Sequence, residues 1–428
     1  MSLPRHKIYI PFATLFSTAI KVFFNKLNRG SNAELLEKKM SKYWGVKKCQ
    51  TLSSWRLGFH YVLRSLELEE GDEVLLTPLG IADIVNAITL LKLKPVFVEM
   101  DPNTHNIDTT NLERKITKNT KVIHITYLSG MVPNLDQIIA IAKENNLTVI
   151  EDITQNYGAT YKGKLVGTFG DFAVGSFSLG KCLASLIGGF VITDNETFYE
   201  KIKSYCDQDL KKPKKKFLLR FCFGQLMIKI TTSKYFFNLI THTVFSLLAR
   251  LNPKKLEEIH HPKYYYKNLH KQSFYENPPM FREFWPDDIY SYFSDLQAQV
   301  ALVTFGKLET GFNKRRELAK TLLVNLNSDI KNMLPSALLD NYNCVYYHFT
   351  IFVNKNIEKF QHYLLRNGID AVGYALPINS SEKVFQEFKQ DLPLAKEIKE
   401  KTIFLPIHDD YSNKEMVLMA DILNKYFR

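Results

Sequence analysis

Short apolar segments alternate with amphipathic segments through the first half of the chain, and this alternation constrains the fold more than any other feature. The apolar segments have the length of strands, and the amphipathic segments repeat their apolar residues at helical spacing. We expect strands over residues 73–76, 95–100, 121–126, 148–151, 172–177 and 189–193, and helices over residues 33–43, 57–68, 81–91 and 135–145. Such strands need helices on both sides, so the pattern predicts an α/β fold with a mostly parallel sheet.

The pattern changes after residue 204, and the expected domains follow from that change. The expected parts are a large α/β domain (1–204), a basic and apolar helical insertion (205–285), a linking helix region (286–319) and a small α+β domain (320–428). In the last two parts we expect helices over 295–319, 357–367 and 416–427, and strands over 346–353 and from residue 368. A chain of 428 residues is long enough for both domains.

The net charge of +12 is concentrated in the insertion, where residues 211–256 contain eleven Lys or Arg and no Asp or Glu. The same segment is rich in Phe, Leu and Ile. Cationic, apolar segments can lie in the interface of an anionic bilayer, so docking on a membrane is one hypothesis. A dimer interface or a self-packing helical hairpin is the alternative. Binding to nucleic acid needs no long apolar runs, and we do not expect it.

The cysteines and the N-terminus indicate where the protein works. The five cysteines are scattered, with no CxxC pair and no zinc-ligand spacing, so we expect reduced thiols and no metal site. The first residues lack the apolar core of a signal peptide, and the longest charge-free apolar stretch, 235–249, is too short to span a bilayer. We therefore expect a cytoplasmic protein, with peripheral attachment to the inner face of the membrane under the docking hypothesis.

Polar side chains cluster where the predicted strands end. Asp152 and Gln155 follow the strand over 148–151, and Ser176 and Lys181 follow within the next thirty residues. In parallel sheets, ligands bind at the carboxyl ends of the strands. Pyridoxal phosphate needs a carboxylate to keep its pyridine nitrogen protonated, a lysine to form a Schiff base and a small hydroxyl group near its phosphate. These residues, in this order, predict a pyridoxal phosphate site.

Longer motifs connect this site with a known family. They are found, in chain order, at residues 71–74 (Gly-Asp-Glu-Val), 95–102, 106–108, 151–164, 176–183, 188–193, 294–298, 314–319 and 404–408. Together they resemble the DegT/StrS family of pyridoxal phosphate-dependent sugar aminotransferases, which have the fold-type I architecture. The resemblance covers most of the chain, with residues 205–285 as the exception.

The resemblance implies a role for each residue of the predicted site. Lys181 would carry the cofactor and move the proton, Asp152 would pair with the pyridinium nitrogen, and Gln155 would lie beside the ring. The implied substrates are an amino-acid donor such as glutamate and a keto-sugar linked to a nucleotide or a lipid. The implied setting is envelope-glycan or natural-product biosynthesis, and the implied assembly is a homodimer.

The resemblance also implies how the phosphate is bound. Ser176 would bind it together with Ser54, Trp55 and Arg56 at a helix N-terminus. Trp55 and Arg56 stand where the family usually has Gly-Thr or Ala-Thr. Arg56 could therefore bind phosphate or form an ion pair, and Trp55 could bind cofactor or belong to the core.

Other positions depart from the family pattern as well. No aromatic residue falls within 79–82, where the family usually stacks one on the ring, and residues 288–292 lack the family's Asn and Arg. Two alternatives therefore stay open beside the aminotransferase. One is a catalytically degenerate member that acts as a membrane-associated scaffold or regulator. The other is a sugar dehydratase, although relatives of that type replace the lysine that is present here as Lys181.

Overall fold

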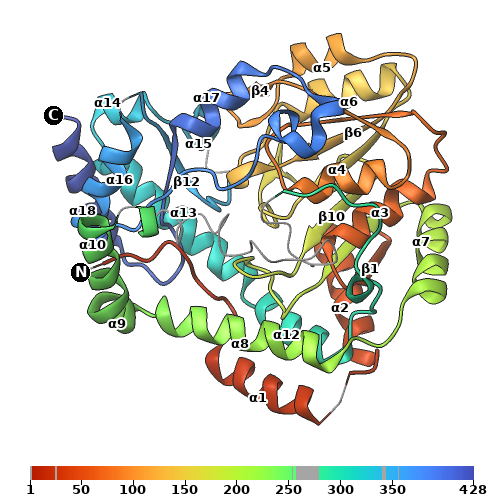
Figure 1. The fold of residues 1–428 in the computed structure, drawn as a ribbon, viewed down its shortest axis with the longest axis horizontal. Helices are drawn as coiled ribbons and strands as arrows, with labels where there is room; N and C mark the ends of the chain where they lie inside the picture. Colours follow the sequence, from red (N-terminus) through yellow and green to blue (C-terminus); the bar gives the residue numbers. More distant parts are fainter. Residues whose placement is uncertain (1, 25–26, 253, 257–278, 340–343, 355) are drawn as a thin grey trace.

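Seven strands form the central sheet of the protein, in the order β1-β11-β10-β7-β6-β2-β3 (Figure 1). The computed structural model describes residues 2–24, 27–252, 254–256, 279–339, 344–354 and 356–428. The strands are β1 Lys48–Leu52, β2 Glu73–Leu76, β3 Lys94–Phe97, β6 Thr120–Thr126, β7 Thr148–Asp152, β10 Phe172–Ser176 and β11 Gly189–Thr193. Strands β10, β7, β6, β2 and β3 are parallel, whereas β11 is antiparallel to both of its neighbours. The predicted mostly parallel α/β sheet is confirmed.

Buried side chains on the two faces of the sheet form two separate hydrophobic clusters. Successive residues of a strand point to opposite faces, so Val122 and Ile123 belong to different clusters, as do Val149 and Ile150. The helices that contribute to these clusters include α2 Ser31–Trp44, α3 Trp55–Ser65, α4 Ala82–Thr89, α6 Leu135–Glu144, α12 Asp295–Phe305 and α17 Pro393–Lys401. Coverage on both faces explains why the strands are apolar throughout.

A smaller α+β unit follows the large sheet. Its elements are α13 Leu308–Asn325, β12 Phe349–Phe352, α16 Ile357–Arg366, β13 Thr402–Leu405 and α18 Asn413–Tyr426, and β12 pairs with β13 in antiparallel fashion. The first residues of the chain also join this unit, because Leu3 forms a parallel bridge with Ile369. The N-terminal segment therefore runs from the small unit toward the large one.

Three predicted elements of this region were wrong in detail. The helix expected over 295–319 is two helices, α12 and α13, which are separated at Gly306, a residue with low helix propensity. The strand expected over 346–353 begins only at Phe349, because Tyr346 has a positive φ of 46° that no strand accommodates. The strand expected from residue 368 is reduced to single bridges at Ile369 and Val372.

Most of the described part of the insertion is helical, except residues 210–214 and 279–285, and residues 253 and 257–278 lie outside the described residues. It contains α8 Lys215–Thr231, the short α9 Lys234–Phe236, a π-helical turn Phe237–Thr241 and α10 His242–Leu251, while α7 Glu196–Asp209 continues past residue 204. Helix α8 packs along α1 Phe12–Phe23 at one edge of the molecule (Figure 1). None of the helices among the described residues has both the length and the apolarity of a bilayer-spanning segment.

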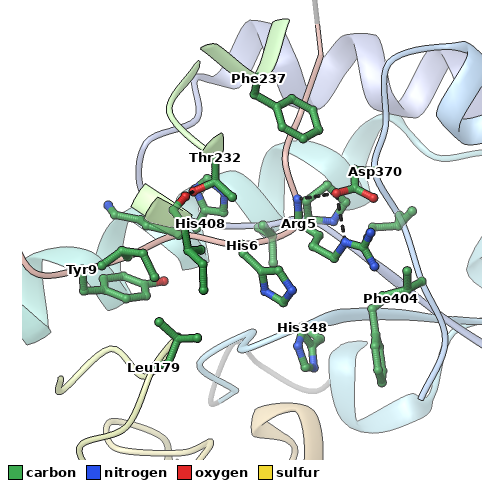
Figure 2. Close-up of a pocket in the computed structure, with 18 of the residues that line it drawn as sticks. Arg5, His6, Tyr9, Leu179, Thr232, Phe237, His348, Asp370, Phe404 and His408 are labelled. Atoms are coloured by element: carbon green, nitrogen blue, oxygen red, sulfur yellow. Dashed lines mark hydrogen bonds and ion pairs between the residues drawn. The ribbon is translucent and has the colours of Figure 1, made fainter. Parts of the chain in front are cut away.

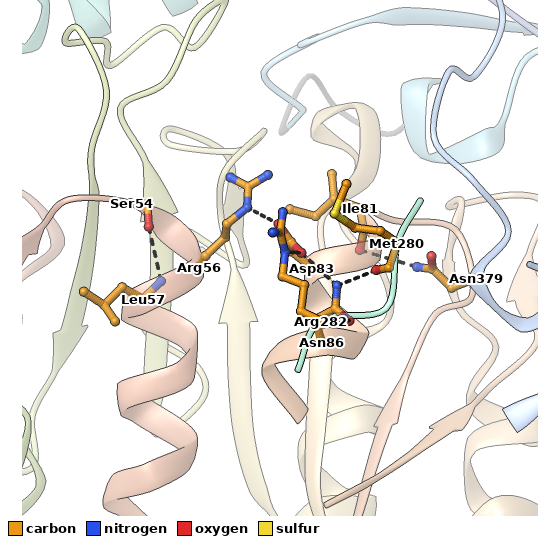
Figure 3. A network of polar contacts seen from close by, with 9 residues as sticks. All are labelled: Ser54, Arg56, Leu57, Ile81, Asp83, Asn86, Met280, Arg282 and Asn379. Atoms are coloured by element: carbon orange, nitrogen blue, oxygen red, sulfur yellow. Dashed lines mark hydrogen bonds and ion pairs between the residues drawn. The ribbon is translucent and has the colours of Figure 1, made fainter. Parts of the chain in front are cut away.

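A buried ion network ties the end of the insertion to the large domain (Figure 3). Asp83 of α4 is fully buried and accepts hydrogen bonds from Arg56 of α3 and from Arg282. The Nη2 atom of Arg282 lies 3.2 Å from Asp83, and the Asn86 amide donates to the Met280 carbonyl at 2.9 Å. The two guanidinium groups hold the pKa of Asp83 below its usual value against the effect of burial.

We predict that Asp83→Ala lowers the free energy of unfolding by about 3–5 kcal/mol, because it removes a fully buried carboxylate that both Arg56 and Arg282 contact. Urea unfolding followed by circular dichroism measures this change. Glu70→Ala is the matched control: it removes the exposed pair with Lys92 and should cost less than about 1 kcal/mol. Equal effects of the two substitutions would contradict the structural role of Asp83.

Candidate cofactor and active site

Asp152 is the last residue of β7, and its carboxylate lies at the carboxyl end of the parallel sheet. It accepts a hydrogen bond from the Thr154 backbone N–H at 2.9 Å. Burial raises the pKa of Asp152 to about 6, although the Thr154 hydrogen bonds, the positive charge of Lys181 and the Trp55 indole act in the opposite direction. Burial thus disfavours the ionised form of Asp152, whereas the nearby positive charge of Lys181 favours it.

The neighbouring residue Glu151 has a different task, because alternate residues of a strand face opposite sides. Its carboxylate accepts backbone N–H groups from Gly167, Phe169 and Gly170 at 2.6–2.7 Å and the Tyr127 hydroxyl at 2.5 Å. Glu151 thus fixes the loop before β10. Of the two adjacent acids, only Asp152 is available to a ligand at the strand ends.

Ser176 ends the adjacent strand β10, whose register places Val174 opposite Asp152. The Ser176 hydroxyl lies 2.8 Å from the Ser178 hydroxyl and accepts the Ser178 backbone N–H at 3.2 Å. The chain then turns tightly, since the Lys181 N–H donates to the Ser178 carbonyl at 3.2 Å and Gly180 has a φ of 78°. This turn brings Lys181 back over the end of the sheet.

The Lys181 amine lies against an aromatic ring of the small unit. Its Nζ atom is 5.0 Å from the centroid of the Tyr347 ring, and the Tyr347 hydroxyl donates to the Gly180 carbonyl at 3.3 Å. The positive charge of Lys181 also acts, after burial, to lower the pKa of His348, which is about 3. The lysine therefore lies where the large and small units meet.

Ser54, Trp55 and Arg56 form the first turn of α3, beside β11. The Ser54 hydroxyl caps the helix by accepting the Leu57 N–H at 3.3 Å. A Cβ atom on Gly189 would lie 2.3 Å from the Trp55 nitrogen, so only glycine allows the helix N-terminus to approach the sheet this closely. The N-terminus of α3 is thus held near the end of β10, where Ser176 lies.

The two open questions about this turn receive different answers. Trp55 is buried and stacks on Phe59 with ring centroids 5.1 Å apart, and its edge meets His124. It is thus a core residue that also faces Asp152 through its indole nitrogen. Arg56 forms the ion pair with Asp83 described above. Its predicted contact with phosphate stays a prediction.

Gln155 lies in the turn that follows β7. Its side-chain oxygen accepts the Ser129 backbone N–H at 2.8 Å, and Ser129 has a positive φ of 59°. The hydrogen bond anchors Gln155 to the loop after β6. The predicted position of Gln155 beside a cofactor ring stays a prediction.

Two residues of this site, Ser178 and Tyr347, were not predicted from the sequence. Ser178 could have been found, because it is a second hydroxyl residue two positions after Ser176, just past the end of β10. Tyr347 could not, because it comes from the small unit, more than 150 residues after Lys181 along the chain. Its run of neighbours, Tyr346 to Phe352, only indicated a strand.

The chemistry of these side chains fits pyridoxal phosphate. The buried carboxylate of Asp152 could pair with a ring nitrogen, and the hydroxyls of Ser176 and Ser178 could bind a phosphate near the N-terminus of α3. Lys181 supplies the amine that the cofactor requires. The Trp55 indole N–H and the Thr154 hydroxyl are further buried donors next to Asp152. Fold and site together define a fold-type I pyridoxal phosphate-dependent transferase.

Comparison with known proteins identifies the family. The sequence profile of the DegT/DnrJ/EryC1/StrS aminotransferase family matches residues 19–232 and 289–423, which is well over half of the chain. The chain therefore belongs to the DegT/DnrJ/EryC1/StrS aminotransferase family, whose members are pyridoxal phosphate-dependent transaminases. The resemblance expected from the motifs is confirmed, but the expected exception of residues 205–285 was too wide, because the match continues through α8 to residue 232 and the unmatched segment is 233–288.

Individual relatives agree with this assignment. GDP-perosamine synthase of Escherichia coli O157:H7 is 36% identical over 183 residues, which is 43% of this chain and 50% of that relative. dTDP-3-amino-3,6-dideoxy-alpha-D-galactopyranose transaminase of Aneurinibacillus thermoaerophilus is 28% identical over 93% of this chain and 90% of its own length. The structure of Helicobacter pylori PseC, an aminotransferase of pseudoaminic acid biosynthesis, shares the fold with a TM-score of 0.73, 17% identity and coverage of 100% of this chain and 99% of its own.

We predict that Asp152→Asn stabilises the cofactor-free protein at neutral pH. The folded-state pKa of Asp152, about 6, lies above its ordinary value of 3.8, so ionisation is disfavoured in the folded state and stability falls as pH rises between these values. The amide removes this effect, which amounts to about 3 kcal/mol at pH 7.5 and about half of that at pH 5. Urea unfolding at both pH values measures the difference.

Asp171→Asn is the matched control for this prediction, because Asp171 lies in an exposed position just before β10. Its substitution should not raise the free energy of unfolding at either pH. A less stable Asp152→Asn protein at pH 7.5 would show that the partners of Asp152 outweigh its burial.

Proposed function

We propose that this chain transfers an amino group from an amino acid, with glutamate as the donor, to a keto-sugar in envelope-glycan or natural-product biosynthesis. The observation that carries the proposal is the juxtaposition of Lys181 with Asp152 at the carboxyl end of the sheet. The relatives named above support the keto-sugar, because two of them are named for the synthesis of amino sugars on nucleotides.

The residues of the site would divide the work of such a reaction. When bound, pyridoxal phosphate supplies an electron sink that stabilises negative charge on the substrate carbon. The Asp152 carboxylate would keep the ring nitrogen protonated, and the Ser176 and Ser178 hydroxyls would hold the phosphate. Lys181 would accept the proton that leaves the donor carbon at its Nζ atom, and would return a proton in the second half of the exchange.

We further propose a homodimer in which each site lies near the subunit interface. The family relationship supports this assembly, and residues 288–292 align with the family segment that reaches the partner's phosphate. Within one subunit, the Asp288 carboxylate of this segment lies 2.8 Å from the Lys214 amine, near the start of the insertion. Light scattering coupled to size exclusion measures the mass, and a monomer at working concentration would contradict the assembly.

We also propose that the protein is cytoplasmic and attaches to an anionic membrane through the insertion and α1. We define the docking face as Phe12, Phe16, Ile20 and Phe23 of α1 together with Phe223 and Met227 of α8. Each of these side chains is between 45% and 63% exposed, which is unusual for so many large apolar groups in one place. Residues of both helices line one apolar groove between them.

The charge around the docking face favours a bilayer over a second copy of the chain. Lys215 lies 4.4 Å from the Phe23 ring, and Lys216 and Arg220 are exposed on the same helix. Two copies facing each other would bring together two segments that each carry eleven basic and no acidic residues. An anionic lipid surface complements this charge, at about 1 kcal/mol for each nearby Lys or Arg.

We predict that purified protein mixed with pyridoxal phosphate shows the visible absorbance of a lysine-bound cofactor, and that glutamate bleaches it. Lys181→Ala should abolish both signals, because it removes the amine that lies against Tyr347 at the end of the sheet. Lys162→Ala, on an exposed lysine, is the control and should leave them unchanged. A wild-type protein without this absorbance would favour the scaffold alternative over the transaminase.

We predict that the protein floats with vesicles of phosphatidylcholine and phosphatidylglycerol, and less with phosphatidylcholine alone. The double substitution Phe16→Ser and Phe223→Ser should reduce the bound fraction at least about tenfold, because two apolar anchors are lost. Val324→Ser, at a residue of α13 that is 68% exposed, is the control. Equal flotation of all three proteins would contradict the docking face.

A further inference from the structure

A cavity of about 390 Å³ opens beside the Lys181 turn (Figure 2). Four parts of the chain line it: the N-terminal segment 5–9, the residues Leu179 and Gly180 that precede Lys181, the insertion, and the small unit. The cavity therefore lies next to the turn that carries Lys181 and is bounded by the small unit and the insertion. Its lining has a cationic side and an apolar side.

Arg315 of α13 supplies the cationic side. Its guanidinium is buried, lies 6.0 Å from the centroid of the Tyr347 ring and donates to the Tyr9 hydroxyl. Its Nη1 atom has no hydrogen-bond partner among the described residues. Lys181 lies over the same Tyr347 ring, so a ligand held at Arg315 is close to the reacting amine.

The other charged groups around the cavity are already paired. Arg5 donates to Asp370 at 2.9 Å, and Lys7 contacts Asp409 at 2.7 Å and Asp410 at 2.8 Å. Arg315 forms no ion pair within the described part of the chain, although the charge of Asp409 acts on it, and the free Nη1 atom of this buried guanidinium suits an anion with planar or tetrahedral oxygens. Phosphate is such an anion.

The insertion supplies much of the apolar side. Ile228 of α8 and Phe245 of α10 line the cavity together with Phe237, whose ring centroid is 6.3 Å from that of Phe245. The family profile stops at residue 232 and resumes at 289, so Phe237 and Phe245 belong to a segment outside it. This wall offers aliphatic and aromatic contacts where a nucleotide base and ribose would need polar partners.

Helix α8 relates this wall to the docking face. Ile228, Thr231 and Thr232 face the cavity, whereas Phe223 and Met227 of the same helix face solvent on the docking face. A chain that leaves the cavity along the insertion therefore reaches the surface that we assign to the bilayer. The Gln225 amide also donates to the Ser185 and Leu186 carbonyls at 3.0 and 2.6 Å, which fixes α8 to the Lys181 loop.

We infer that the acceptor is a keto-sugar carried on a lipid phosphate, with its phosphate at Arg315 and its hydrocarbon chain against Ile228, Phe237 and Phe245. This inference rests on the proposed aminotransferase function and deepens it. In this inference, the insertion selects a substrate with an anionic head and a hydrocarbon chain over a nucleotide-linked sugar. Arg315 acts as a positioning residue that holds the substrate beside Lys181.

Calorimetric titration of the full-length, cofactor-loaded protein with decyl phosphate, without vesicles, tests the inference. Decyl phosphate should bind at least about tenfold more tightly than inorganic phosphate or uridine diphosphate. Phe245→Ser should weaken decyl phosphate about tenfold and leave inorganic phosphate unchanged. Arg315→Gln should weaken both ligands, and Arg315→Lys should restore part of the loss.

Phe223→Ser, on the docking face, is the matched control and should bind decyl phosphate as the wild type does. Tighter binding of uridine diphosphate, or no effect of Phe245→Ser, would overturn the inference. Phe245 is only half-buried, so we expect Phe245→Ser to fold. Its binding data therefore test the inference even if Arg315→Gln does not fold. Failure of the aminotransferase proposal is read separately, from cofactor absorbance that glutamate does not bleach.

Discussion

The parallel pairing of β7 with β10 is the constraint on which the rest of the site depends. Its register sets Val174 opposite Asp152, so Asp152 and Ser176 leave the sheet at the same edge. The turn that follows β10 then returns Lys181 over that edge. A shift of one residue in this register would exchange Asp152 with Glu151, whose carboxylate is committed to three backbone N–H groups.

Much of this arrangement could be predicted from the sequence because it is local. Strand length, apolar periodicity and the position of acids at strand ends act over a few residues, and they placed Asp152, Ser176 and Lys181 in one region. Local patterns did not predict features that depend on tertiary packing. It could not show that the helix over 295–319 is broken at Gly306, or that the positive φ of Tyr346 shortens β12.

Contacts between distant parts of the chain were beyond local reasoning. By its chemistry Arg56 could bind either a phosphate or a carboxylate. Only the fold brings Asp83, 27 residues away, to Arg56, and adds Arg282, 226 residues away, to the same carboxylate. Tyr347 reaches Lys181 from the small unit in the same way. The insertion was recognised by its charge, but its two faces were not, because they emerge only when α8 packs against both α1 and the Lys181 loop.

The Gln225 contact has a consequence for which part of the insertion can be removed. Ser185 and Leu186 are buried, and their carbonyl groups accept hydrogen bonds from the Gln225 amide. Gln225 belongs to the part of the chain that the family profile matches, which ends at residue 232. Removing α8 would leave two buried carbonyl groups without this donor within a few residues of Lys181, at a cost of about 1–3 kcal/mol for each. A relative that lacks only the segment after residue 232 would keep this contact, whereas one without α8 must supply a substitute donor, such as an ordered water.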